Sequence, residues 1–176
     1  MLVGIIGNVN PKKVLDILGK TEKETTKIYE ALGSSLKGHG IIMVPEGQLM
    51  TLARAYKKAG GKRFIGIVPT ADKIWGWEHV KETAKECDER IEGMDWIRLP
   101  YDLTKKAEAF ILLGFGTGSA MELNFIKYNY KFGKENKPVY AFTPLLDGGR
   151  LPRSIEYDIK DILTYFSKPD ELRDLL

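Results

Sequence analysis

Cysteine and histidine are scarce in this chain. Its 176 residues include one cysteine, Cys87, and two histidines. A single cysteine excludes an intramolecular disulfide and a cluster of cysteine metal ligands, and the two histidines lack the spacing of a zinc site. The sequence therefore indicates no metal site.

Long hydrophobic runs and a strong charge imbalance are also missing. The longest apolar run, around Ala109–Leu113, falls far short of the ~20 residues that a membrane helix needs. The N-terminus enters residues 2–6 without the basic region of a signal peptide. The net charge of +3 argues against a dedicated nucleic-acid surface. We expect a cytoplasmic protein that binds neither membrane nor nucleic acid.

Alternating strand and helix patterns are what the sequence does contain. Apolar runs predict strands at residues 2–6, 41–44, 64–68, 96–99, 109–113 and 138–142. Helical patterns are expected after Thr21, at residues 47–59, 77–91 and 119–132, and in a short last helix before Leu176. The alternation predicts one α/β domain, residues 1–176, with a doubly wound, mostly parallel sheet and helices on both faces.

The most specific signal is a glycine-rich turn after the most apolar strand. Glycines let a ligand approach bare N–H groups, and the N-terminus of the following helix favours an anion. We therefore predict phosphate binding by Gly114, Gly116, Thr117, Gly118 and Ser119. No lysine follows, which excludes a Walker A loop; an ordinary strand-to-helix turn is the alternative.

Glu122 follows in the first turn of that helix. Its carboxylate is predicted to hold ribose hydroxyls or to act in C–N bond cleavage, and compensation of the helix dipole is the simpler alternative. In a doubly wound sheet, ligands bind beyond the carboxyl ends of the strands, where the strand order reverses. Gly7 and Asn8 after the first strand, and Gly47 after the second, are therefore predicted to line the same crevice. Asn10 more readily bonds its own backbone.

Two tryptophans, Trp75 and Trp77, flank Gly76 in a loop. Stacking of a base is one interpretation, but packing over the sheet edge or at a subunit contact is the one that we favour. The helix at residues 119–132 carries apolar or aromatic groups around much of its circumference, which predicts a homodimer or higher homo-oligomer.

Over roughly its first 145 residues the chain resembles a Rossmann-like superfamily. It includes the LOG ("lonely guy") phosphoribohydrolases and the molybdenum-cofactor carrier proteins. The resemblance rests on the loop Gly116-Thr117-Gly118-Ser119-Ala120-Met121-Glu122, similar to the family's Gly-Gly-x-Gly-Thr-x-x-Glu, and on the strands before it and at Ile65-Gly66-Ile67-Val68-Pro69. The spelling Gly-Ser-Ala-Met-Glu is also similar to the nucleoside deoxyribosyltransferases, in which the glutamate is a nucleophile.

The chain departs from the phosphoribohydrolases in two places. Its second loop reads Pro45-Glu46-Gly47-Gln48 where the family has a run of glycines, and the Met-His-Glu-Arg-Lys segment is missing, with Arg98 near its place. We therefore expect a carrier- or sensor-like protein that binds a nucleoside monophosphate or a molybdopterin-type cofactor. The alternative is a phosphoribohydrolase or deoxyribosyltransferase that cleaves an N-glycosidic bond, with Glu122 and Arg98 acting on one ligand.

Overall fold

A computed structural model describes residues 1–7 and 10–176, without the side chains of residues 17 and 18. In these residues the strands and α-helices alternate along most of the chain. Their bounds are β1 Leu2–Gly7, α1 Pro11–Leu18, α2 Glu22–Ser35, β2 Gly40–Met43, α3 Gly47–Lys58, β3 Phe64–Ile67, α4 Glu78–Ala84, β4 Glu89–Ile91, α5 Leu99–Lys106, β5 Ala109–Leu113, α6 Thr117–Lys131, β6 Val139–Phe142, α7 Arg153–Ile159, β7 Leu163–Phe166 and α8 Leu172–Leu175. Short 3₁₀ turns lie at Thr143–Leu145, Asp147–Gly149 and Pro169–Glu171.

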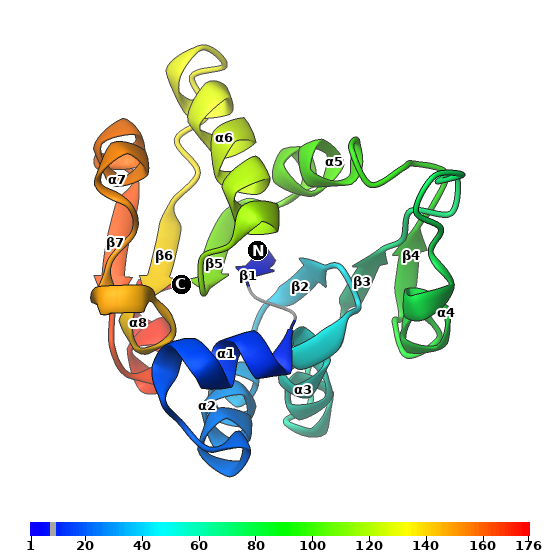
Figure 1. Cartoon of the computed structure of the whole chain (residues 1–176), viewed down its shortest axis with the longest axis horizontal. Helices are drawn as coiled ribbons and strands as arrows, with labels where there is room; N and C mark the ends of the chain where they lie inside the picture. The colour runs from blue at the N-terminus through cyan, green and yellow to red at the C-terminus, as the bar shows by residue number, and fades with distance from the viewer. Residues whose placement is uncertain (8–9) are drawn as a thin grey trace.

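Within the described residues, seven parallel strands form one sheet in the order β4-β3-β2-β1-β5-β6-β7. The chain builds outwards from β1 to β4, then crosses back to β5 on the other side of β1 (Figure 1). This confirms the predicted doubly wound α/β fold. The strand order reverses between β1 and β5, where Gly7 lies beside Leu113. A ligand of such a sheet is expected at this carboxyl edge.

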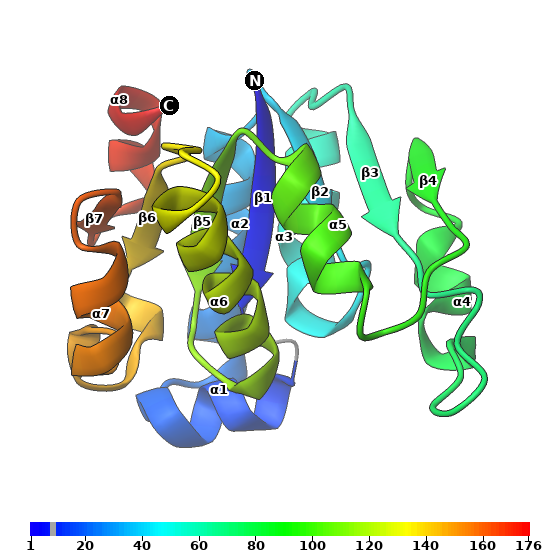
Figure 2. The same ribbon diagram turned by 90° about the horizontal axis from the view of Figure 1, so that it is seen from above.

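Helices cover both faces of the sheet. Figure 2 shows α5, α6 and α7 on one face with α2 and α3 on the other, while α1 lies beyond the tip of β1. Alternate residues of each strand point to opposite faces: Ile5 packs in the core beneath α2 and α3, and Ile6 in the core beneath α5 and α6.

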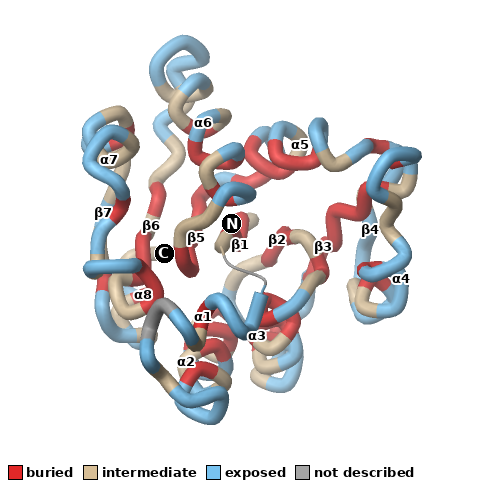
Figure 3. Tube along the Cα trace, viewed as in Figure 1, coloured by how far each residue is buried: buried red, intermediate tan, exposed pale blue. Residues whose placement is uncertain are grey.

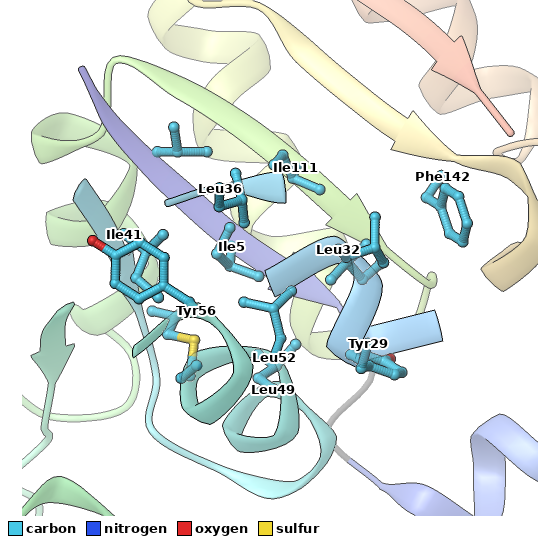
Figure 4. Packing of buried hydrophobic residues seen from close by; sticks show 14 of the residues in the cluster. Ile5, Tyr29, Leu32, Leu36, Ile41, Leu49, Leu52, Tyr56, Ile111 and Phe142 are labelled. Carbon is cyan, nitrogen blue, oxygen red and sulfur yellow. The ribbon is translucent and has the colours of Figure 1, made fainter. Parts of the chain in front are cut away.

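Burial follows this layering. In Figure 3 the central strands lie in the buried interior, whereas the edge strands β4 and β7 and the outward sides of the helices are more exposed. Figure 4 shows the core on the α2 and α3 face, where Leu32 and Leu52 meet Ile5 and Ile111. The two helices approach closely because Gly33 has no side chain: a Cβ there would lie 2.2 Å from the carbonyl oxygen of Leu52.

Two predicted elements are wrong. The helix expected at residues 77–91 ends at Ala84, and the edge strand β4 follows at Glu89–Ile91. Val80 and Ala84 are buried on the short helix, whereas Cys87 comes from the following turn and Ile91 from the strand. Apolar residues at helical spacing thus belong to two elements, which periodicity alone does not separate. The strand expected at residues 96–99 is a turn that enters α5.

The cap predicted at the start of α2 is confirmed. Thr21 and Glu24 form the expected capping box of α2. Strand β7 had no counterpart among the predicted strands. In the part of the chain that the structure describes, every helix is too short or too polar to cross a bilayer.

Candidate functional site

The glycine-rich turn joins β5 to α6 at the carboxyl edge of the sheet. Gly114 has φ +101°, a conformation that residues with a Cβ rarely adopt. Gly116 precedes the helix and has no side chain to cap it. The Ser119 hydroxyl bonds back to this glycine, accepting from its N–H at 2.7 Å. Ser119 therefore holds the turn in shape, whereas Gly118 and Thr117 are exposed.

The first turn of α6 offers bare N–H groups. Its first intrahelical bond runs from the Ala120 N–H to the Gly116 carbonyl at 2.9 Å. The N–H groups of Thr117, Gly118 and Ser119 precede that bond, so they have no carbonyl partner within the helix. Together with the positive end of the helix dipole they form a surface that favours an anion.

Glu122 lies one turn further along the same helix and is buried, with only 9% of its surface exposed. No hydrogen bond from the described part of the chain accounts for its burial, and desolvation raises the pKa of Glu122 to about 8. A carboxyl group with this pKa is mostly protonated at neutral pH, and in that form it can donate a hydrogen bond and carries no charge.

A cavity of about 280 Å³ opens in front of Glu122. Its walls come from the ends of β1 and β2, the starts of α3, α5 and α6, and the loop before α4. We call it the indole cavity, after Trp75 and Trp96. Its lining residues are Ile5, Ile6, Gly7, Val44, Glu46, Leu49, Trp75, Trp96, Ile97, Leu99, Pro100, Gly118, Ser119, Met121 and Glu122.

Asp72, a residue that the sequence interpretation missed, organises the loop that carries Trp75. One carboxylate oxygen accepts from the N–H groups of Ile74, Trp75 and Gly76 at 2.6–3.1 Å. The other accepts from the Trp96 N–H at 3.3 Å. Burial by itself would raise the pKa of Asp72, but these backbone donors outweigh it and lower the pKa. The Asp72 carboxylate thus holds the backbone at both tryptophans that line the cavity.

The cavity is lined by Trp75 and Trp96, whereas the sequence had drawn attention to Trp75 and Trp77. Trp75 is 63% exposed and lines the cavity. Trp96, which had been assigned to a strand, lines it as well. Trp77 instead precedes α4 and lies under the Lys81 ammonium group, 5.9 Å from the ring centre.

Of the predicted loop residues Gly7 and Gly47, one lines the indole cavity and the other does not. Gly7 lines the cavity, but its lack of a side chain is required by packing, since a Cβ would lie 2.2 Å from the Leu113 carbonyl oxygen. Gly47 begins α3 with φ +51°, outside the lining, and its neighbour Glu46 faces the cavity instead. Asn8 lies outside the described residues. Asn10 caps α1 by accepting from the Lys13 N–H, as expected of a turn asparagine.

Arg98 does not share a site with Glu122 in this geometry. Its side chain is 68% exposed, and the guanidinium donates from Nε to the Asp102 carboxylate at 3.1 Å. Ile97 and Leu99 line the cavity on either side of it, but Arg98 does not. In this arrangement Arg98 forms a surface ion pair with Asp102, outside the residues that line the cavity with Glu122.

A second, more open cavity of about 600 Å³ lies on the other side of the α6 N-terminus. Gly116, Thr117 and Ala120 line it, whereas Gly118, Met121 and Glu122 line the first. Lys13 and Arg150 contribute cations to it, and Arg150 is already paired with Glu156. The first turn of α6 therefore stands between an apolar cavity and a more polar one.

Among the described residues, no three His, Cys, Asp or Glu side chains lie close enough together to hold a metal ion. His39 and His79 lie in different environments. His39 is partly buried between two glycines, and desolvation lowers its pKa. His79 stands beside the indole cavity, 3.8 Å from Glu46.

Solved structures share the fold, although no family model and no curated protein matches the chain. The molybdenum cofactor carrier protein MCP from Chlamydomonas reinhardtii is 17% identical, with a TM-score of 0.65 over 99% of this chain and 94% of that one. The molybdenum cofactor binding protein from the phototrophic bacterium Rippkaea orientalis is 18% identical, with a TM-score of 0.66 over 99% and 93%. TM1055, a structural genomics target, is 18% identical, with a TM-score of 0.68 over 99% and 96%. At such identities the similarity establishes the fold, and it confirms the predicted resemblance at that level.

Proposed function

We propose that this chain is a carrier that binds a phosphate-bearing planar heterocycle between the ends of β1 and β5. The proposal rests on one observation: groups that favour a phosphate and groups that can stack on a flat ring lie next to each other at the start of α6. The N–H groups of Thr117 and Gly118 favour a phosphate, and the adjoining cavity is lined by Trp75 and Trp96, whose indoles are suited to stacking on a flat ring. A nucleoside monophosphate and a molybdopterin-type cofactor both have this composition.

The molybdenum cofactor fits these residues as cargo. Two of the similar structures are named for it, and its pterin ring and phosphate correspond to the two halves of the site. The first turn of α6 would hold the phosphate, and the indole cavity would hold the pterin. Glu122 supports this assignment because a neutral carboxyl group does not repel an anionic ligand.

The enzyme alternative rests on the same carboxyl group. A pKa near the working pH suits a general acid, and Glu122 has one of about 8. An N-glycosidic hydrolase would add water to GMP and release guanine and ribose 5-phosphate. The carrier account expects GMP to stay intact on incubation, as chromatography would show. Guanine release that Glu122→Gln abolishes would instead establish the hydrolase.

The phosphate contribution gives the first quantitative prediction. We expect 5′-GMP to bind at least about tenfold more tightly than guanosine, because a charge-assisted hydrogen bond contributes about 1.5–3 kcal/mol. Isothermal titration calorimetry measures both affinities, and added sulfate should compete with GMP but not with guanosine. Equal affinities for the two compounds would show that the α6 N-terminus does not hold the phosphate.

We also propose that the chain forms a homodimer or higher homo-oligomer through α6. Tyr128 and Phe132 stack on each other at 5.9 Å and are exposed on this helix, Phe132 to 77%. Light scattering at micromolar concentration should give at least a dimer mass, and Tyr128→Lys with Phe132→Lys should give a monomer. Tyr157→Lys, on α7, changes an equally exposed ring and should leave the mass unchanged. A monomeric wild-type protein would contradict the proposal.

The location of the protein in the cytoplasm, which the sequence analysis expects, stays a prediction.

A further inference from the structure

Glu46 is a charged group in the indole cavity that the phosphate site does not use. It follows β2 and immediately precedes α3, yet its side chain does not cap that helix. The side chain is 30% exposed and lines the cavity, as Trp96 does. Burial raises the pKa of Glu46, and the neighbouring His79 opposes that shift.

His79 connects Glu46 to the wall of the cavity. Its Nε2 lies 3.8 Å from the Glu46 Oε1. Its ring stacks on the Trp96 indole, with ring centres 5.4 Å apart and planes 13° from parallel. The indole is held in turn, because its Nε1–H donates to the Gly76 carbonyl at 2.7 Å. Glu46 and the Trp96 indole, which both line the cavity, are thus linked through the imidazole of His79.

We infer that Glu46 reads the edge of the bound heterocycle by accepting from an amino group and the adjacent ring N–H, with His79 as its positioning residue. A carboxylate offers two acceptor oxygens and no donor when ionised. Guanine and pterins share such an edge, whereas adenine, hypoxanthine and lumazine do not carry the amino group next to a ring N–H. The inference rests on the proposed function, and it adds a selectivity for the 2-aminopyrimidin-4-one ring that guanine and pterins share, which phosphate binding alone does not give.

The test compares pairs of probes that differ in this amino group. Calorimetry with 5′-GMP and 5′-IMP, and with pterin and lumazine, should show roughly a tenfold or larger preference for the amino compound in each pair that binds, as expected for a hydrogen bond to a charged group. In Glu46→Gln the preference should fall to within about threefold, because the amide replaces one acceptor oxygen by a donor. Glu82→Gln, an exposed change on α4, should keep the wild-type ratio.

His79→Phe tests the positioning role. A phenyl ring retains the stacking surface on Trp96 but removes the imidazole nitrogen that faces Glu46, so the GMP to IMP ratio should fall while IMP affinity stays within about twofold of the wild-type value. An unchanged ratio would remove His79 from the inference.

The outcomes separate this inference from the proposed function. If wild-type protein binds GMP and IMP equally, and pterin and lumazine equally, ring-edge recognition by Glu46 is overturned while the phosphate site stands. If none of the probes binds, both are overturned. A stronger preference within the pterin pair identifies a cofactor as the ligand, and a preference confined to GMP identifies a nucleotide.

Discussion

Gly118→Asp is expected to weaken GMP binding by at least about 100-fold. Gly118 lies in the first turn of α6 and lines the indole cavity. A Cβ built there meets no atom of the described residues within 4 Å, so these residues leave room for the Cβ of an aspartate. Its charge would lie beside the predicted phosphate, and two unit charges about 5 Å apart repel by about 3 kcal/mol at an effective dielectric constant near 20.

This substitution separates binding from stability. An aspartate in the first turn interacts favourably with the helix dipole and stabilises the helix by about 0.3–1 kcal/mol. This offsets part of the free energy that is lost if the new carboxylate is partly desolvated. Gly118→Asn is the matched control, since it has the same shape without the charge, and it should bind GMP within about fivefold of wild type. Calorimetry and urea unfolding measure the two properties. A Gly118→Asp protein that folds and binds GMP normally would place the anion elsewhere.

Glu122→Gln is expected to stabilise the protein at alkaline pH and to change little at acid pH. Burial raises the pKa of Glu122 from 4.5 to about 8, so the folded chain keeps a proton that the unfolded chain releases between these values. Wild-type stability therefore falls as pH rises through that window, by up to about 1.4 kcal/mol per pH unit. The amide does not titrate and escapes this loss.

Urea unfolding of wild type and Glu122→Gln at pH 5, 7 and 9 measures the difference. The free energy of unfolding of the variant should exceed that of wild type by an amount that increases from pH 5 to pH 9. Glu30→Gln, on the exposed side of α2, controls for the loss of a carboxylate from the chain. A constant difference at the three pH values would mean that Glu122 is ionised or paired when folded, and it would remove the argument for a neutral carboxyl group in the site.

The central strands could be predicted from sequence because each is an uninterrupted apolar run. Ala109–Leu113 is buried at every position, as a strand covered on both faces must be. The edges of the sheet carry no such signal. β4 reads Glu-Arg-Ile and is largely exposed, and it is held by long-range contacts: the Asp88 carboxylate accepts from the Phe64 N–H at 2.8 Å, and Arg63 pairs with Glu89. Local periodicity contains no information about either contact.

The residues of the candidate site likewise include some that local sequence features reveal and others that they do not. The turn at residues 114–122 was predictable because glycine, strand end and helix start are all local features. Trp96 and Asp72 belong to the site through a hydrogen bond between residues 24 positions apart, which no spacing rule reveals. Glu46 was one residue from the predicted Gly47, and the side chain, rather than the glycine, faces the cavity. Arg98 was expected at the crevice; its neighbours Ile97 and Leu99 line the cavity, and Asp102 one helical turn later accepts the hydrogen bond of Arg98.

Backbone amide shifts in a titration with 5′-GMP test the central claim most directly. In a ¹⁵N-labelled sample the largest changes are predicted at the amides of Thr117, Gly118 and Ser119, together with the indole N–H of Trp75, because phosphate and ring contact these groups at the same time. Saturation with GMP that leaves those three amides unmoved, while signals elsewhere shift, would contradict a phosphate-bearing ligand at the start of α6.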